Sequence, residues 1–117
     1  MVNYERYAEA TANVDAVHAM TLRNAQRFAR VPAPEVSQED RARCRRDQAF
    51  TAQTSRKAVN MLYEECGGSA LFESSDLQRF WRDANGAAAH RGLTGDWIYA
   101  GWAKTLLGVQ PDPGFLF

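Results

Sequence analysis

The sequence has few cysteines, few histidines and no net charge, and each shortage excludes a class of protein. Its 14 basic and 14 acidic side chains cancel, so no overall field would draw it to nucleic acid or an anionic membrane. Cys44 and Cys66 lie 22 residues apart in one predicted helix, too far apart to bond. No stretch approaches the roughly 18 apolar residues of a membrane span, and the start lacks a basic region followed by an apolar run. We therefore expect a cytoplasmic domain with reduced thiols.

Motifs for several common chemistries are missing as well. The sequence has no P-loop, no dinucleotide-binding glycine fingerprint, no HExxH and no paired CxxC, so we expect neither nucleotide hydrolysis nor a metal site. With only two histidines and no serine at a strand-to-helix turn, a serine triad is excluded.

What the sequence does contain is helical periodicity and helix boundaries. With 117 residues, 45% of them apolar, it is long enough for one core. Asn3 and Ser37 can cap helices, Gly67-Gly68 can end one, and Ser75 with Gln78 reads as a capping box. We predict an all-α, up-and-down four-helix bundle over residues 1–110 and a C-terminal tail over 111–117. The predicted helices span about 4–31, 38–66, 76–90 and 95–107.

The apolar positions predict more surface than one small bundle can bury. On the first helix they step by three and four: Tyr7, Thr11, Val14, His18, Thr21, Ala25 and Phe28. On the second they form one stripe: Cys44, Gln48, Ala52, Ser55, Val59, Leu62 and Cys66. Phe50, Ala58 and Met61 widen this second surface, and Trp97, Trp102 and the tail Phe115-Leu116-Phe117 add to it. We expect at least a dimer.

The two histidines differ in their surroundings. His18 falls on the apolar stripe of its helix, which favours a core histidine over a functional one. His90 follows Ala87-Ala88-Ala89 at a helix end, where small residues leave space and the helix terminus favours a protonated ring. The alternative is a solvated terminal histidine. The cluster Arg41, Arg43, Arg45 and Arg46 is more typical of a solvated helix face than of a phosphate patch.

Three motifs, in this order along the chain, make it similar to a known family. They are Gly67-Gly68-Ser69-Ala70-Leu71-Phe72, followed by Leu77-Gln78-Arg79-Phe80-Trp81-Arg82-Asp83, and Ala89-His90-Arg91-Gly92-Leu93-Thr94. Together they resemble the C-terminal helical domain of the acyl-CoA dehydrogenase superfamily. The likeness is strongest to the two-component flavin-dependent monooxygenases, which hydroxylate aromatic and polyketide-type substrates with reduced flavin from a separate reductase.

The resemblance implies roles for particular residues. Where the dehydrogenases carry a catalytic glutamate, this branch has the histidine that matches His90, placed to hydrogen-bond the flavin hydroperoxide or the substrate hydroxyl. Gly67, Gly68 and Ser69 match a turn that approaches the flavin of a neighbouring subunit. The N-terminal and middle domains that hold most of the flavin, FMN or FAD, have no counterpart in this sequence.

Two hypotheses of function follow. In the first, the chain is the C-terminal part or a split subunit of such a monooxygenase, and it works with a companion flavin-binding chain, a flavin reductase and a small-molecule substrate. In the second, it is an interaction module or a small flavin-free cyclase derived from that domain.

Overall fold

The computed structural model describes residues 3–115, and these residues contain four α-helices and no strand. The α-helices are α1 (Tyr4–Phe28), α2 (Gln38–Glu65), α3 (Asp76–Ala88) and α4 (Gly95–Leu106). Three short 3₁₀ turns connect them: η1 (Ala33–Glu35), η2 (Gly67–Leu71) and η3 (Arg91–Leu93). The all-α class with four helices is thus confirmed.

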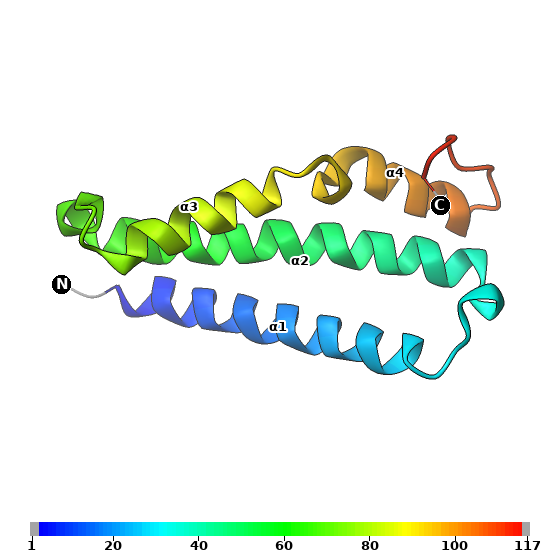
Figure 1. Ribbon diagram of the computed structural model, residues 1–117, viewed down its shortest axis with the longest axis horizontal. Helices are drawn as coiled ribbons and strands as arrows, with labels where there is room; N and C mark the ends of the chain where they lie inside the picture. The colour runs from blue at the N-terminus through cyan, green and yellow to red at the C-terminus, as the bar shows by residue number, and fades with distance from the viewer. Residues whose placement is uncertain (1–2, 116–117) are drawn as a thin grey trace.

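Helix α2 is the centre of the molecule, and the other helices flank it. Figure 1 shows α1 running antiparallel along one side of α2, while α3 and α4 follow one another along the other side. The result is an elongated body of 50 × 26 × 24 Å. The four helices therefore form three layers: α1, then α2, then α3 and α4 in line. The chain after α3 continues along α2 instead of turning back as a hairpin.

Most helix boundaries follow from the local sequence. The Asn3 side chain accepts a hydrogen bond from the Arg6 amide at 3.1 Å, and Ser37 Oγ accepts one from the Asp40 amide at 3.1 Å. Gly67 takes a φ of +61°, the left-handed conformation that ends α2.

Three boundaries differ from the prediction. Helix α1 ends at Phe28 rather than near 31, because residues just before Pro32 disfavour helical geometry. Helix α3 ends at Ala88, which leaves His90 outside it. Ser75 makes no side-chain cap, and the Gln78 side chain donates to the Leu71 carbonyl at 3.0 Å rather than bonding back to Ser75. The predicted capping box is therefore wrong.

The core lies between α2, α4 and the chain after α4. Ala42 and Ala49 of α2 pack with Ile98 and Phe115, all at most 1% exposed. Gly101 makes room for the Phe115 ring, which meets Trp97 edge-on with ring centroids 6.1 Å apart. Phe115, which we expected to add to the apolar surface that the bundle cannot bury, is thus buried within this chain, while Leu116 and Phe117 lie outside the described residues.

The side of α1 that faces α2 is rotated from the predicted stripe. Ala10 is fully buried, and Val17 and Asn24 are half-buried against α2. By contrast Tyr7 is 57% and Val14 52% exposed. His18 is exposed too, so the expected core histidine is not found. Both apolar stripes exist, but the one on α1 borders an open surface.

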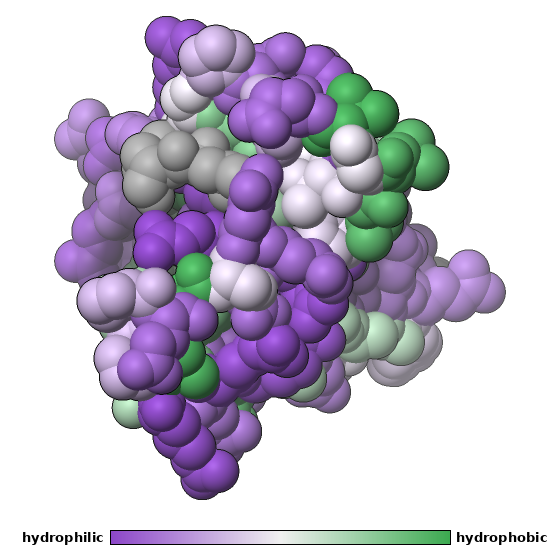
Figure 2. Space-filling view, turned by 90° about the vertical axis from the view of Figure 1, so that its right-hand side faces the viewer, coloured by the Kyte–Doolittle hydropathy of each residue, from purple (hydrophilic) through white to green (hydrophobic). Residues whose placement is uncertain are grey.

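Large apolar side chains are exposed at several places on the surface. Figure 2 looks along the molecule from the end that carries the α1–α2 connection, and one hydrophobic patch stands out there among hydrophilic residues. Leu106, Leu107 and Val109 are exposed where α4 ends at this side. Within residues 3–115, no helix has the length and apolar character of a membrane span, and no three acidic, histidine or cysteine side chains cluster as metal ligands would.

Candidate functional site

His90 lies on the connection between α3 and α4, at the start of turn η3. Its Nδ1 accepts a hydrogen bond from the Gly92 amide at 3.0 Å, so the ring caps the turn. The side chain is exposed and lies outside α3, as in the alternative of a solvated histidine.

The turn that carries His90 is held by side chains of α2 and α4. Gln53 Nε2 donates to the Ala88 carbonyl at 3.3 Å and to the Leu93 carbonyl at 3.1 Å. Trp97 Nε1 donates to the Arg91 carbonyl at 3.2 Å. These bonds satisfy carbonyls on both sides of His90 and fix its backbone against α2. The sequence analysis did not identify Gln53, because it lies 35 and 40 residues before the carbonyls that it binds and no local pattern connects them.

Two cavities lie beside this turn, although His90 lines neither. One, of about 690 Å³, lies between α2, the end of α3 and the start of α4, and it includes Ala88, Ala89, Arg56, Trp97 and Tyr99. Burial raises the pKa of the Tyr99 hydroxyl above its ordinary value. The other, of about 340 Å³, lies between α1, α2 and α3 and contains the predicted small residues of α3. The space expected near the alanine run is present on both sides of it.

The turn at Gly67, Gly68 and Ser69 lies at the opposite end of α3 from His90. Its backbone is open, because a β-carbon at Gly67 or Gly68 would meet nothing within 4 Å. Ser69 Oγ donates to the Cys66 carbonyl at 2.9 Å. The 13 residues of α3 separate this turn from His90 by roughly 20 Å. The structure therefore does not bring the two predicted site elements together within one chain.

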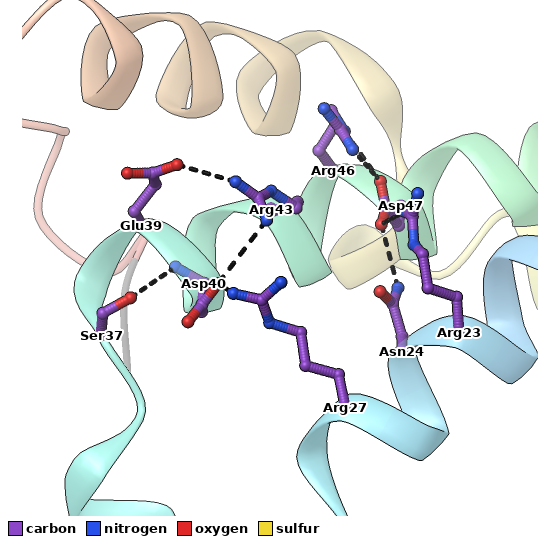
Figure 3. Close-up of polar contacts among 9 residues, drawn as sticks. All are labelled: Arg23, Asn24, Arg27, Ser37, Glu39, Asp40, Arg43, Arg46 and Asp47. Atoms are coloured by element: carbon purple, nitrogen blue, oxygen red, sulfur yellow. Dashed lines mark hydrogen bonds and ion pairs between the residues drawn. The ribbon is translucent and has the colours of Figure 1, made fainter. Parts of the chain in front are cut away.

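A buried charge cluster joins α1, α2 and α4, and the sequence analysis did not predict it. Asp47 is only 1% exposed. Its Oδ2 accepts hydrogen bonds from Arg23 at 2.7 Å and from Asn24 at 3.0 Å, and its Oδ1 accepts one from Arg46 Nε at 2.7 Å (Figure 3). The Arg46 guanidinium also lies 4.7 Å from the centre of the Trp102 ring. The cluster thus connects all three layers.

The same cluster corrects the interpretation of the arginine run. Arg43 and Arg46 are half-buried and stack over Trp102, so they do not form a solvated face. Asp40 lies next along the helix face and pairs with Arg27 at 2.6 Å (Figure 3). The signal was available: Asp40 and Asp47 are seven residues apart, and Arg23 and Arg27 four apart, which puts each pair on one helix face.

Comparison with known proteins gives a consistent result. The family model described as "Acyl-CoA dehydrogenase, C-terminal domain" matches residues 3–94. The oxygenase component of the FADH(2)-dependent resorcinol hydroxylase of Rhizobium sp. (strain MTP-10005) is 37% identical over 91% of this chain and 27% of its own length. The oxygenase subunit HsaA of a flavin-dependent monooxygenase of Mycobacterium tuberculosis is 32% identical over 91% of this chain and 27% of its own length.

Solved structures agree with the sequence relatives. The crystal structure of 3-HSA hydroxylase from Rhodococcus sp. RHA1 superposes with a TM-score of 0.86 at 30% identity. The superposition covers 97% of this chain and 30% of the 3-HSA hydroxylase chain. The chain thus spans about a quarter to a third of the length of these relatives. From its family match and its fold, this chain belongs to the acyl-CoA dehydrogenase C-terminal domain family.

Proposed function

We propose that this chain acts as the C-terminal part of the oxygenase component of a monooxygenase that uses reduced flavin to hydroxylate an aromatic substrate. The similarity to resorcinol hydroxylase across 91% of the chain is the observation that carries this proposal. The chain spans 27% of that relative, and the flavin-binding domains that complete the oxygenase lie either on a companion chain or elsewhere on the same polypeptide. A separate reductase supplies the reduced FMN or FAD, and we expect the assembly in the cytoplasm.

The residues of the chain fit a partial flavin site. When bound, the reduced flavin supplies the activation of dioxygen. His90 offers an exposed imidazole in a turn whose backbone is fixed, so it can exchange a proton with the substrate hydroxyl. Gly67, Gly68 and Ser69 present open backbone to a group that comes from another chain. The separation of these two elements suits contacts with different flavins or with different ends of one.

The cavity of about 690 Å³ beside the His90 turn suits an aromatic ring. Trp97 provides an apolar wall, and Arg56 provides a cation that can receive a phenol oxygen. We place the substrate here, with its hydroxyl toward the turn.

Reconstitution tests the proposal. The chain is mixed with its companion flavin-binding chain, a flavin reductase and a phenolic substrate, and incorporation of an oxygen atom from labelled dioxygen is measured. His90→Ala should lower product formation by roughly 10²–10⁴-fold, the scale of a lost acid–base group, while flavin oxidation continues uncoupled from product. His90→Gln, which keeps an N–H donor, should recover part of the coupling. Equal coupling in all three proteins would remove His90 from the reaction.

The second hypothesis, an interaction module or flavin-free cyclase, is favoured by one observation. Residues of the predicted α2 stripe line three open cavities beside α1, which leaves surface that a partner could fill. Flavin absorbance after co-purification separates the two functions, because a module or cyclase would stay colourless with the companion present. Anaerobic turnover of a polyketide-like compound would support the cyclase.

A further inference from the structure

Gln53 connects the middle of α2 to both ends of the segment that carries His90. Its Nε2 donates to the Ala88 carbonyl at 3.3 Å and to the Leu93 carbonyl at 3.1 Å. Ala88 is the last residue of α3, and Leu93 is the last residue of turn η3. The two carbonyls are held close together, because both are bonded to the same nitrogen. One amide group of α2 thus closes the loop from which the imidazole projects.

The Ala88 carbonyl needs a donor from outside its own helix. The last four carbonyls of an α-helix have no amide within the helix to bond. Here the amide of His90 bonds the Ala87 carbonyl at 3.2 Å, and Gln53 provides the donor for Ala88. Ala88 is only 3% exposed, so little water reaches its carbonyl. Loss of the glutamine donor therefore leaves a buried acceptor unsatisfied unless the loop moves.

Other bonds of the turn come from its own neighbourhood and fix its internal shape. His90 Nδ1 accepts from the Gly92 amide at 3.0 Å, and a β-carbon at Gly92 would lie 3.1 Å from the same nitrogen. Trp97 Nε1 and Thr94 Oγ1 both donate to the Arg91 carbonyl, at 3.2 and 2.9 Å. The partners in these bonds lie within six residues of one another. They define the turn, whereas the α2 amide sets where the turn lies relative to the rest of the chain.

Gln53 also borders the cavity in which we place the substrate. It lines this cavity of about 690 Å³ together with Thr94 and Trp97. Asn60 lies seven residues further along α2 and thus on the same helix face, and it accepts a hydrogen bond from the Asn85 side chain of α3 at 2.9 Å. The face of α2 that carries Gln53 is therefore fixed against α3, and it offers a rigid reference for the turn beside the cavity.

We propose that Gln53 is a positioning residue, which holds the imidazole of His90 at the edge of the cavity by bonding the backbone on both sides of it. This inference rests on the proposed function, in which His90 exchanges a proton with the substrate. In this role Gln53 acts through the turn and not on the reacting atoms. Loss of its donors should let the loop between α3 and α4 shift, and a shift of about 1 Å can cost roughly 100-fold in rate.

Two glutamines of α2 provide a matched pair of variants. Gln53→Met removes both donated bonds and keeps the length of the side chain. Gln48→Met makes the same chemical change at an exposed side chain that makes no hydrogen bond within the described residues. Gln53→Lys restores donors, since an ammonium group can donate to both carbonyls. Methionine and lysine are good helix formers, and far-UV circular dichroism should show the same helix content in all three variants.

Hydrogen exchange of the chain by itself, followed by NMR, tests the positioning without any flavin. The amides to follow are those of Gly92 and Leu93, which bond the imidazole and the carbonyl of His90 at 3.0 and 2.8 Å. In Gln53→Met they should exchange about 10-fold faster or more, because two hydrogen bonds of the loop are lost, while the amides of α1 exchange as in the wild type. Gln48→Met should match the wild type, and Gln53→Lys should recover part of the protection. Unchanged exchange of both turn amides in Gln53→Met would overturn the inference.

The reconstituted monooxygenase tests the consequence for the reaction. In Gln53→Met the product formed per reduced flavin consumed should fall by about 10–100-fold, while flavin oxidation continues at the wild-type rate. A general loss of structure would lower both rates together. Wild-type coupling in Gln53→Met, beside impaired coupling in His90→Ala, would overturn the inference and leave the proposed function intact. Equal coupling in the wild type and His90→Ala would instead overturn the proposed function, and the exchange of the turn amides then decides the positioning.

Discussion

Replacing Asp47 by asparagine removes the charge at the centre of the cluster that joins α1, α2 and α4. The carboxylate is 1% exposed and accepts hydrogen bonds from Arg23, Asn24 and Arg46 at 2.7–3.0 Å. An amide keeps the shape but turns one acceptor oxygen into a donor. Whichever way it is oriented, at least one guanidinium then faces an N–H group.

The magnitude follows from how well the two arginines can return to water. Breaking a fully buried ion pair costs about 3–5 kcal/mol. Here the Arg23 side chain is 56% exposed and that of Arg46 is 29% exposed, so water can recover part of the lost solvation. We therefore expect Asp47→Asn to lower the free energy of unfolding by about 2–3 kcal/mol.

Urea unfolding followed by circular dichroism measures this change. Glu39→Gln is the matched control, since it makes the same chemical change in an exposed pair with Arg43 on one helix. It should cost no more than about 0.5 kcal/mol. A loss below about 0.5 kcal/mol for Asp47→Asn, or an equal loss in both variants, would refute the view that this cluster holds the layers together.

Two further substitutions probe other parts of the fold. Burial opposes ionisation of Asp40, but hydrogen bonding from Ser37 and the ion pairs with Arg27 and Arg43 more than offset it and lower the pKa of its carboxyl. The stability this adds is fully present above the ordinary value of about 3.9 and is lost as pH falls through the lower folded value. The difference in urea stability between wild type and Asp40→Asn should therefore shrink below about pH 4, and a difference constant down to pH 2 would contradict this. Gly101→Ala should lower the melting temperature, at a cost of about 1–3 kcal/mol, because its β-carbon would overlap the buried Phe115 ring. In Gly68→Ala, where a β-carbon meets nothing within 4 Å, no comparable loss is expected, and equal melting of the two variants would refute the packing argument.

The helices were predictable because their signals are local. Asn3, Ser37 and Gly67 act through residues within one turn of themselves, and the structure confirms each. On α2 helix periodicity was less accurate: most of the predicted row is half-buried, whereas the fully buried positions Ala42, Asp47 and Ala49 lie off it. A stripe shows that a face is apolar, and it does not identify the neighbour.

The features that were missed depend on contacts between distant parts of the chain. Gln53 reaches the Leu93 carbonyl across 40 residues, and Phe115 enters the core beside Gly101. On α1 the prediction chose the more apolar stripe, whereas Ala10, Val17 and Asn24 face α2, because close helix packing and the bond to Asp47 favour small and polar residues there. The His90 side chain caps its own turn, which the helix-end argument could not anticipate.

The described part of the chain has a thin apolar core. Six of the eight buried apolar residues in the described part of the chain are alanines, and only Ile98 and Phe115 are large. Alanine contributes little apolar area, so much of the available hydrophobic stabilisation remains in half-buried side chains such as Val59 and Leu62. The exposed ion pairs that link α1 to α2, such as Lys57 with Glu9, add only about 0.2–1 kcal/mol each. A chain with so thin a core gains most by covering its apolar face, and a partner that binds only the folded form stabilises it by mass action.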